Sequence, residues 1–202
     1  MTHYFSKPKD IIQNRREISF RFLDVLSTFI VDDGIFSKDK ADFGSLLLVE
    51  EVIKRKESGH ILDLGSGYGL MSLLLKQHLK NVEISGIEIN PRALDCAHKS
   101  AEKLNLKVQF SEGDVSLDVV GIYDVIITNP PIRAGKEVVF NFLNQAAKHL
   151  DKDGRLYFVM RRQQGVASAV KYCENLFEQS ERCVLKKGYE VWCMRKPLTS
   201  AL

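Results

Sequence analysis

Residues 60–90 read HILDLGSGYGLMSLLLKQHLKNVEISGIEIN. An apolar run at residues 61–64 is followed by a glycine-rich loop and by the helical pattern of residues 70–79. A second apolar run at residues 82–88 completes a strand–loop–helix–strand unit. Two strands connected through a helix lie parallel in one sheet, so this unit predicts an open α/β fold.

The same alternation continues downstream of this unit. The predicted helices cover residues 91–104, 136–150 and 166–177. The predicted strands cover residues 108–110, 123–128 and 155–160, and a last hairpin covers residues 180–186 and 189–195, turning at Lys187-Gly188. The whole pattern predicts a Rossmann-like, seven-stranded, mostly parallel sheet with an antiparallel C-terminal hairpin.

Upstream of residue 60 the pattern changes to a short β-rich extension. Residues 18–36 read as two or three short strands, with the Asp-Gly pair at residues 33–34 supplying one turn. A helix to about residue 56 follows, capped by Asp42 or Ser45.

These patterns divide the chain into two parts. Residues 1–45 form the N-terminal extension, packed on the main domain, and residues 46–197 form that main domain. The chain has no internal repeat and no low-complexity linker between them.

Composition narrows the class of protein. Hydrophobic residues make up 45% and charged residues 27% of 202 residues, as in a soluble globular protein. The net charge of +3 is too small to require a nucleic-acid partner, so an argument for RNA depends on local patches of basic residues.

The start has no signal-peptide pattern, and no apolar stretch is long enough to span a membrane. Four cysteines without metal-ligand spacing indicate reduced thiols in a cytoplasmic protein with no metal site.

Four unusual segments follow four successive predicted strands. They are the glycine loop of residues 63–69, Glu88, Asp114 and the segment Asn129-Pro130-Pro131-Ile132. The loop differs from the GxGxxG dinucleotide pattern because its third glycine comes one residue early, and no lysine follows as in a P-loop. Because the carboxyl ends of parallel strands border the ligand crevice, we expect all four segments to line one site.

Asn129 and Pro130 predict a specific chemistry. The two prolines stiffen the backbone and remove N–H donors, so this segment offers carbonyl oxygens. The side-chain carbonyl of Asn129 and the main-chain carbonyl of Pro130 form two fixed acceptors, which suit a planar NH2 group. A strand end closed by a proline turn is the plainer alternative.

The order DLGSGYG, IEIN, EGDV and ITNPPI resembles the class I S-adenosylmethionine-dependent methyltransferases. In detail it resembles the "small" methyltransferase family, which includes bacterial rRNA guanine-N2 methyltransferases. The resemblance covers roughly residues 20–196 and includes DFGS at residues 42–45 and KKGY at residues 186–189.

The resemblance implies S-adenosylmethionine as cofactor and S-adenosylhomocysteine as product. It places Asp63 near the methionine amino group, Glu88 on the ribose hydroxyls, and Asp114 with the Val115 backbone on the adenine. The implied cofactor-binding residues are Asp63, Gly65, Ser66, Gly67, Gly69, Glu88, Ile89, Asn90, Asp114 and Val115. The implied catalytic residues are Asn129, Pro130, Pro131 and Ile132, of which Asn129 and Pro130 grip the nucleophilic nitrogen.

One departure concerns the residue after the two prolines, which is aromatic in many amino-methyltransferases and is Ile132 here. Stacking on the target base then falls to Phe36, whose alternative role is core packing, or Ile132 packs the base by dispersion. Arg133, Lys136 and Arg161 are the candidate substrate-binding cations, with solvated side chains as the alternative.

The favoured function is therefore methyl transfer to an exocyclic amino nitrogen, guanine N2 of rRNA. RNA, as rRNA or a ribosomal subunit, is the expected partner, and the enzyme is expected to be a monomer or weak homodimer. A glutamine amide presents the same NH2 group, so a protein methyltransferase is the first alternative. A catalytically silent RNA-binding module is the second, and the intact loop, acids and Asn129 disfavour it. A nicotinamide enzyme is disfavoured by the loop spacing.

Overall fold

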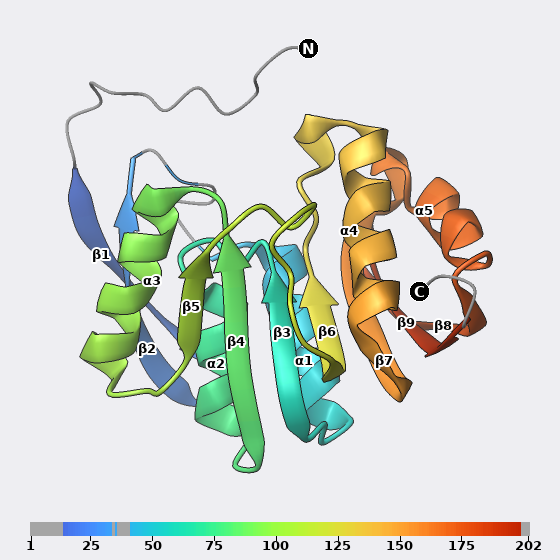
Figure 1. Cartoon of the computed structure of the whole chain (residues 1–202). Coiled ribbons are helices and arrows are strands. Elements are labelled where there is room, and N and C mark those ends of the chain that lie inside the picture. Colours follow the sequence, from blue (N-terminus) through green and yellow to red (C-terminus); the bar gives the residue numbers. More distant parts are fainter. Residues whose placement is uncertain (1–13, 34, 36–40, 199–202) are drawn as a thin grey trace.

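The computed structural model describes residues 14–33, 35 and 41–198. Its main sheet contains seven strands (Figure 1). In order across the sheet they are β5 (Gln109–Glu112), β4 (Val82–Glu88), β3 (Gly59–Leu64), β6 (Tyr123–Thr128), β7 (Leu150–Arg161), β9 (Tyr189–Pro197) and β8 (Phe177–Lys186). The first five are parallel, and β9 is antiparallel to both β7 and β8. The predicted mostly parallel sheet with an antiparallel C-terminal hairpin is confirmed.

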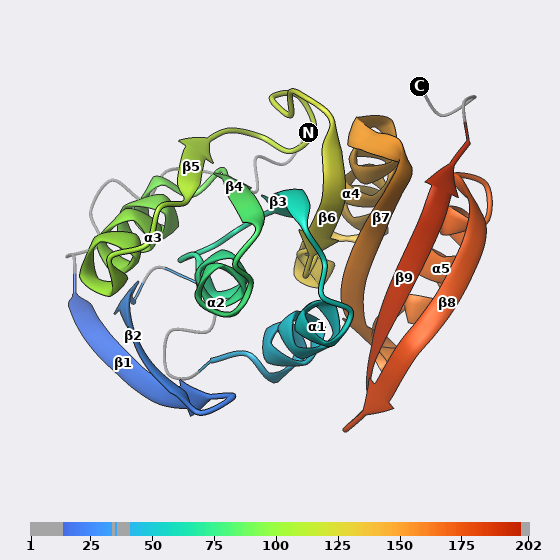
Figure 2. The ribbon, with the colours of Figure 1, turned by 90° about the horizontal axis from the view of Figure 1, so that it is seen from below.

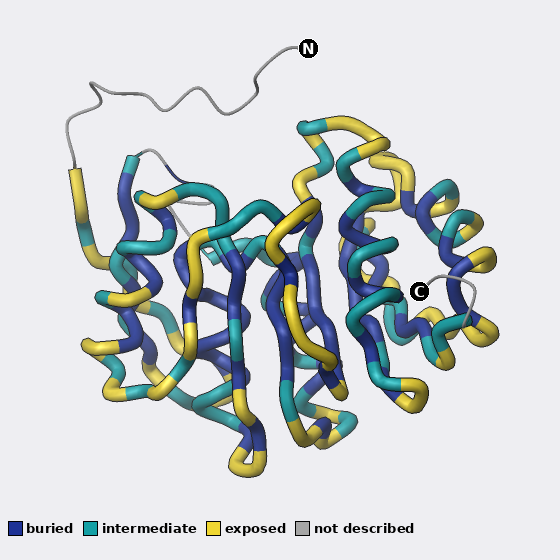
Figure 3. The backbone as a smooth tube through the Cα atoms, in the orientation of Figure 1, coloured by how far each residue is buried: buried dark blue, intermediate teal, exposed yellow. Residues whose placement is uncertain are grey.

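Helices cover both faces of the sheet (Figures 1 and 2). On one face α1 (Phe43–Lys54), α2 (Leu70–His78) and α3 (Pro91–Leu104) share one buried cluster. On the other face α4 (Lys136–His149) and α5 (Val166–Cys173) share a second cluster. Val125, Ile126 and Ile127 of β6 alternate between the clusters, because successive side chains of a strand point to opposite faces. The apolar run of residues 123–128 is thus covered on both sides (Figure 3).

The N-terminal extension is a separate two-stranded hairpin of β1 (Arg15–Phe22) and β2 (Val25–Asp32). Its turn lies at Leu23 and Asp24, where φ is 43° and 68°. The turn predicted at the Asp-Gly pair of residues 33–34 comes after β2: the Ile35 N–H donates to the Asp32 carbonyl at 3.2 Å, and Gly34 itself lies outside the described residues. A two-residue hairpin turn requires positive φ, which Asp24 tolerates as aspartates do.

The hairpin packs against α3 and α2. The backbone N–H of Ile30 donates to Ser100 Oγ of α3 at 2.9 Å, and Ser27 Oγ donates to Gln77 Oε1 of α2 at 2.9 Å. Asp32 and Arg92 form an ion pair at the start of α3. The division of the chain after residue 45 stays a prediction.

Several element boundaries differ from the predicted ones. Helix α5 ends at Cys173 rather than at residue 177, since Phe177 is 4% exposed and begins β8 opposite Pro197. Strand β7 begins at Leu150, before the predicted residue 155.

No helix in the described part of the chain is long and apolar enough to cross a membrane. All four cysteines are free, and three of them are buried.

Candidate functional site

The predicted site segments lie side by side, because β5, β4, β3 and β6 are neighbours in the sheet. The glycine loop after β3 is attached to the end of β4 by three hydrogen bonds. The backbone N–H groups of Gly65 and Ser66 both donate to the Ile87 carbonyl, at 3.0 Å each. The N–H of Gly67 donates to Glu88 Oε2 at 2.8 Å. The end of β4 therefore fixes the position of the glycine loop.

Glu88 connects three of these segments. Its Oε1 accepts from the Asn90 N–H at 2.8 Å, and its backbone carbonyl accepts from the Gly113 N–H at 3.1 Å. Burial raises the pKa of the Glu88 carboxyl, and the N–H groups of Asn90 and Gly67 oppose that rise. An ionised carboxylate offers about four lone-pair sites, so the Glu88 carboxyl can still accept from a ligand hydroxyl.

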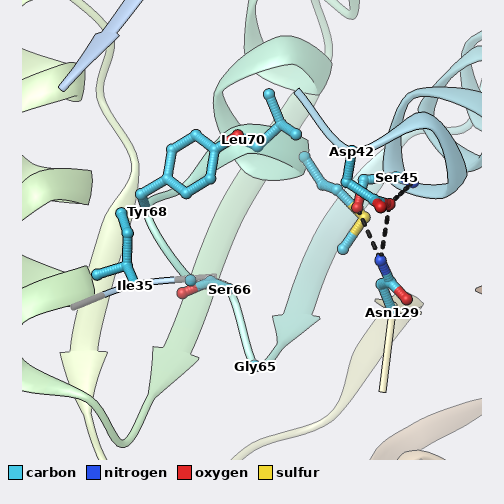
Figure 4. Close-up of a pocket in the computed structure, with 10 residues that line it drawn as sticks. Ile35, Asp42, Ser45, Gly65, Ser66, Tyr68, Leu70 and Asn129 are labelled. Atoms are coloured by element: carbon cyan, nitrogen blue, oxygen red, sulfur yellow. Dashed lines mark hydrogen bonds between the residues drawn. The ribbon is translucent and has the colours of Figure 1, made fainter. Parts of the chain in front are cut away.

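A cavity lies between the glycine loop and the start of α1 (Figure 4). Its volume is about 70 Å³ and it opens to solvent, so it can enclose one end of a small ligand rather than the whole of it. Its lining consists of Ile35, Asp42, Ser45, Gly65, Ser66, Gly67, Tyr68, Leu70, Met71 and Asn129.

Three features of this cavity fit S-adenosylmethionine. Ser66 Oγ and Tyr68 OH are buried polar atoms without a hydrogen-bond partner in the described residues, so a polar ligand can satisfy them. No atom lies within 4 Å of the position that a Cβ would take at Gly67, and its φ of +57° favours glycine. Leu70 and Met71 add apolar surface. The cavity can therefore hold a ligand with a polar methionine end.

The amide of Asn129 has a defined orientation (Figure 4). Its Nδ2 donates to Asp42 Oδ2 at 3.1 Å and to Ser45 Oγ at 2.9 Å. A carboxylate only accepts, so Asp42 determines which end of the amide faces it. Among the described residues none donates to Asn129 Oδ1 or to the Pro130 carbonyl. Both predicted acceptors therefore have no hydrogen-bond donor in the described part of the chain, and Asn129 lines the cavity.

Asp42 and Ser45 hold the Asn129 amide, whereas the sequence predicted only a capping role for them. Asp42 Oδ2 accepts from the Ser45 N–H at 2.8 Å, which confirms Asp42 as the N-cap of α1. The same oxygen anchors Asn129, so the helix start and the candidate catalytic amide share one acceptor. The available signal was the segment DFGS, which the resemblance included.

Asp63 and Asp114 lie outside the cavity lining. Asp63 is fully buried and accepts from Ser72 Oγ at 2.7 Å, while its Oδ1 has no partner in the described residues. Burial raises the pKa of Asp63 to about 7. Asp114 Oδ1 accepts from the Ser116 N–H at 2.7 Å, and Val115 is 4% exposed. Their contacts with the cofactor stay predictions.

The remaining predicted residues spread around the edge of the site. Asn90 caps α3, and its neighbour Ile89 is half-buried. Pro130 is buried and Pro131 is exposed. Ile132 is half-buried in the 3-10 turn η1 (Ile132–Ala134) and packs partly on the second core cluster. Gly69 precedes α2 as its N-cap.

The candidate substrate-binding residues have different surroundings. Arg133 is exposed, and Lys136 Nζ lies 5.0 Å from the Phe140 ring centroid. The Arg161 guanidinium lies 4.6 Å from the centroid of Tyr189. Phe36 lies outside the described residues. No group of three potential metal ligands gathers within the described ranges.

Comparison with known proteins adds a family and several relatives. The methyltransferase small domain matches residues 27–193. The uncharacterized protein YbxB of Bacillus subtilis (strain 168) is 37% identical over 192 residues, which are 94% of this chain and 96% of that protein. Ribosomal RNA small subunit methyltransferase C of Haemophilus influenzae (strain 86-028NP) is 34% identical over 130 residues, 62% of this chain and 39% of that protein.

A solved structure is similar over most of the chain. It is the 16S rRNA N2 G1207 methyltransferase RsmC of T. thermophilus, in complex with AdoMet and guanosine. The TM-score is 0.80 at 30% identity, covering 90% of this chain and 50% of that one. This chain thus spans half or less of these two relatives whose names state an activity.

Proposed function

Because this chain belongs to the methyltransferase small domain family, we propose that it transfers a methyl group from S-adenosylmethionine to guanine N2 of ribosomal RNA. The observation that carries the proposal is the amide of Asn129, whose nitrogen is held by Asp42 and Ser45 while its oxygen is available. The similarity to an rRNA N2 methyltransferase over 90% of the chain supports the same acceptor.

Asn129 and Pro130 act on the nucleophile. An exocyclic amino lone pair is delocalised into its ring, so the nitrogen is a weak nucleophile. Asn129 Oδ1 and the Pro130 carbonyl accept its two hydrogens and hold the lone pair in one direction. Positioning at near-contact distance contributes several kcal/mol to lowering a barrier. The two carbonyl dipoles also stabilise positive charge that develops on the nitrogen.

The loop after β3 and the Glu88 carboxylate act on the cofactor side. S-adenosylmethionine, when bound, supplies an electrophilic methyl group. Ser66 Oγ and Tyr68 OH provide polar contacts for the methionine end, and Glu88 accepts from the ribose hydroxyls. Gly67 leaves open space beside the loop, which lets the backbone approach a ligand closely.

The exposed cations near the start of α4 favour RNA over a protein acceptor. Arg133 and Lys136 have no ion-pair partner among the described residues, and both stand where a helix begins. A phosphate suits that position, since the amino-terminal N–H groups of a helix favour anions. A glutamine side chain would present the same NH2 group but no phosphate.

The test supplies radiolabelled cofactor to total RNA, partly assembled ribosomal subunits and total protein from cells that lack the gene. Label should enter RNA, and nuclease digestion should release it as N2-methylguanosine. Label in protein alone would overturn the proposal in favour of glutamine methylation. Label on adenine would keep the mechanism and change the base. The cytoplasmic location and the monomeric or weakly dimeric state stay predictions.

A further inference from the structure

Four side chains form a continuous row of cations and rings beside the cavity, which we call the Arg161–Lys187 row. Arg161 lies over the ring of Tyr189, with 4.6 Å between the guanidinium carbon and the ring centroid. The Tyr189 and Phe43 ring centroids are 5.6 Å apart. Lys187 Nζ lies 4.9 Å from the Phe43 centroid. Three distant segments, the end of β7, the β8–β9 turn and the start of α1, therefore build one surface feature.

The two cations of this row are held in place without being neutralised. Neither Arg161 nor Lys187 forms an ion pair with a carboxylate of the described residues, and both are exposed. Arg55, at the end of α1, is by contrast paired with Glu51 at 2.8 Å. An aromatic face holds a cation near it but leaves its full charge available to an anion.

The surrounding charge is also positive. Exposed Lys186 is the cross-strand partner of Tyr189 in the β8–β9 hairpin and adds a third cation beside the row. Glu190, the one acid in residues 182–190, is 4% exposed and lies on the other face of β9 from Tyr189. There it accepts from Trp192 Nε1 at 2.8 Å and pairs with Arg162 at 3.1 Å and Arg182 at 3.8 Å. A local excess of cations of this kind attracts an extended polyanion.

The rings of the row are fixed against the residues that hold Asn129. Phe43 directly follows Asp42, the anchor of the Asn129 amide. A Cβ at Gly44 would lie 2.8 Å from the Tyr189 ring, so Tyr189 packs closely on the start of α1. In the β6–β7 register Thr128 is opposite Phe158, so Arg161 lies two residues, roughly 7 Å, beyond the level of Asn129. That distance is on the scale of one nucleotide.

We propose that Arg161 and Lys187, supported by Tyr189 and Phe43, bind backbone phosphates of the RNA next to the target nucleotide. This inference rests on the proposed function for its ligand, a phosphodiester chain whose target base is unpaired or flipped. Phosphate contacts position a nucleic acid and carry no sequence information, so the row would set affinity and register rather than choose the base.

The decisive experiment measures RNA binding as a function of salt, without methyl transfer. The probe is a radiolabelled single-stranded rRNA fragment that the wild type binds, and the variant is Arg161→Gln with Lys187→Gln, which keeps the apolar stems. Each lost phosphate contact reduces the slope of log K against log salt by about 0.7 for single strands, so the double variant should lose about 1.4. The matched control is Lys80→Gln with Lys152→Gln, which removes two exposed cations near the amino-terminal ends of β4 and β7, at the opposite end of the parallel strands.

Tyr189 provides a second variant pair. Tyr189→Phe keeps the ring and should bind RNA as the wild type does, whereas Tyr189→Leu should weaken binding several-fold, because Arg161 loses its support. Cofactor affinity by calorimetry reports that each variant is folded. If the double variant shows the same slope of log K against log salt as the control variant, this inference is wrong, even when the wild-type enzyme methylates RNA. A wild type with no salt-dependent RNA binding overturns it as well, whereas the labelling experiment alone decides the proposed function.

Discussion

Replacing Asn129 by alanine separates catalysis from stability. The change removes the acceptor Oδ1 and the two Nδ2 hydrogen bonds to Asp42 and Ser45, at 3.1 and 2.9 Å. Loss of one oriented transition-state contact typically costs about 10²–10³ in turnover. We therefore expect kcat to fall by about that factor with saturating cofactor and RNA.

The expected effect on folding is much smaller. Asp42 Oδ2 keeps its hydrogen bond from the Ser45 N–H, so the oxygen that Asn129 contacted is not left without a donor. The net loss is about 1–2 kcal/mol of unfolding free energy, or roughly 2–8 °C in Tm. A domain with about 5–15 kcal/mol of stability stays folded after that change, so unfolding cannot account for a hundredfold loss of turnover.

The assay combines single-turnover methyl transfer, calorimetry with S-adenosylmethionine and thermal unfolding. Asn141→Ala is the matched control, because it also removes a side-chain amide, which donates to Ser116 Oγ at 2.6 Å on the exposed side of α4. We expect the control to keep wild-type kcat and both variants to keep the cofactor affinity. An Asn129→Ala enzyme within threefold of wild-type kcat would refute the role given to this amide.

Three further changes test the rest of the site. Asp42→Ala should lower kcat at least tenfold and the unfolding free energy by about 1–2 kcal/mol, because the helix cap and the Asn129 anchor are both lost. Asp42→Asn should recover most of both quantities. Equal kcat in the wild type and the two variants would contradict this prediction. Gly67→Arg should abolish cofactor binding in calorimetry while circular dichroism stays unchanged, since the side chain enters the open space beside the loop. Burial raises the pKa of Asp63 to about 7. Between about pH 4 and 7 the folded protein therefore holds a proton on Asp63 that the unfolded chain releases. The free energy of unfolding should then fall as pH rises through this window. Asp63→Asn should flatten this decline, by up to about 4 kcal/mol in urea unfolding, and parallel curves for the two proteins would show the reasoning to be wrong.

Local patterns were sufficient for most helices and strands. The helix Pro91–Leu104 and the strand Tyr123–Thr128 have the predicted bounds, because a proline at the first turn and a β-branched apolar run act within their own segments. The order of these elements also predicted that the glycine loop, Glu88, Asp114 and Asn129 would meet at one edge, since parallel strands bring their carboxyl ends together.

Boundaries that depend on a distant partner could not be predicted in this way. The hairpin turn at Leu23 and Asp24 has no strong local signal, so the pairing of β1 with β2 and the packing of β2 on α3 were needed to locate it. In the same way, α5 ends at Cys173 because Phe177 is buried in a strand against Pro197.

The same distinction between local and distant determinants applies to the candidate site. The residue types at the strand ends follow from the sequence: glycines, an acid, and an amide followed by prolines. The orientation of that amide depends on the folded chain, because Asp42 and Asn129 are 87 residues apart and meet only when α1 packs beside the end of β6. Arg161, Tyr189, Phe43 and Lys187 likewise come from three segments, so their row exists only in the folded chain. The hydrophobic periodicity of a segment indicates which of its residues share one face, whereas these contacts depend on which segments the folded sheet brings together.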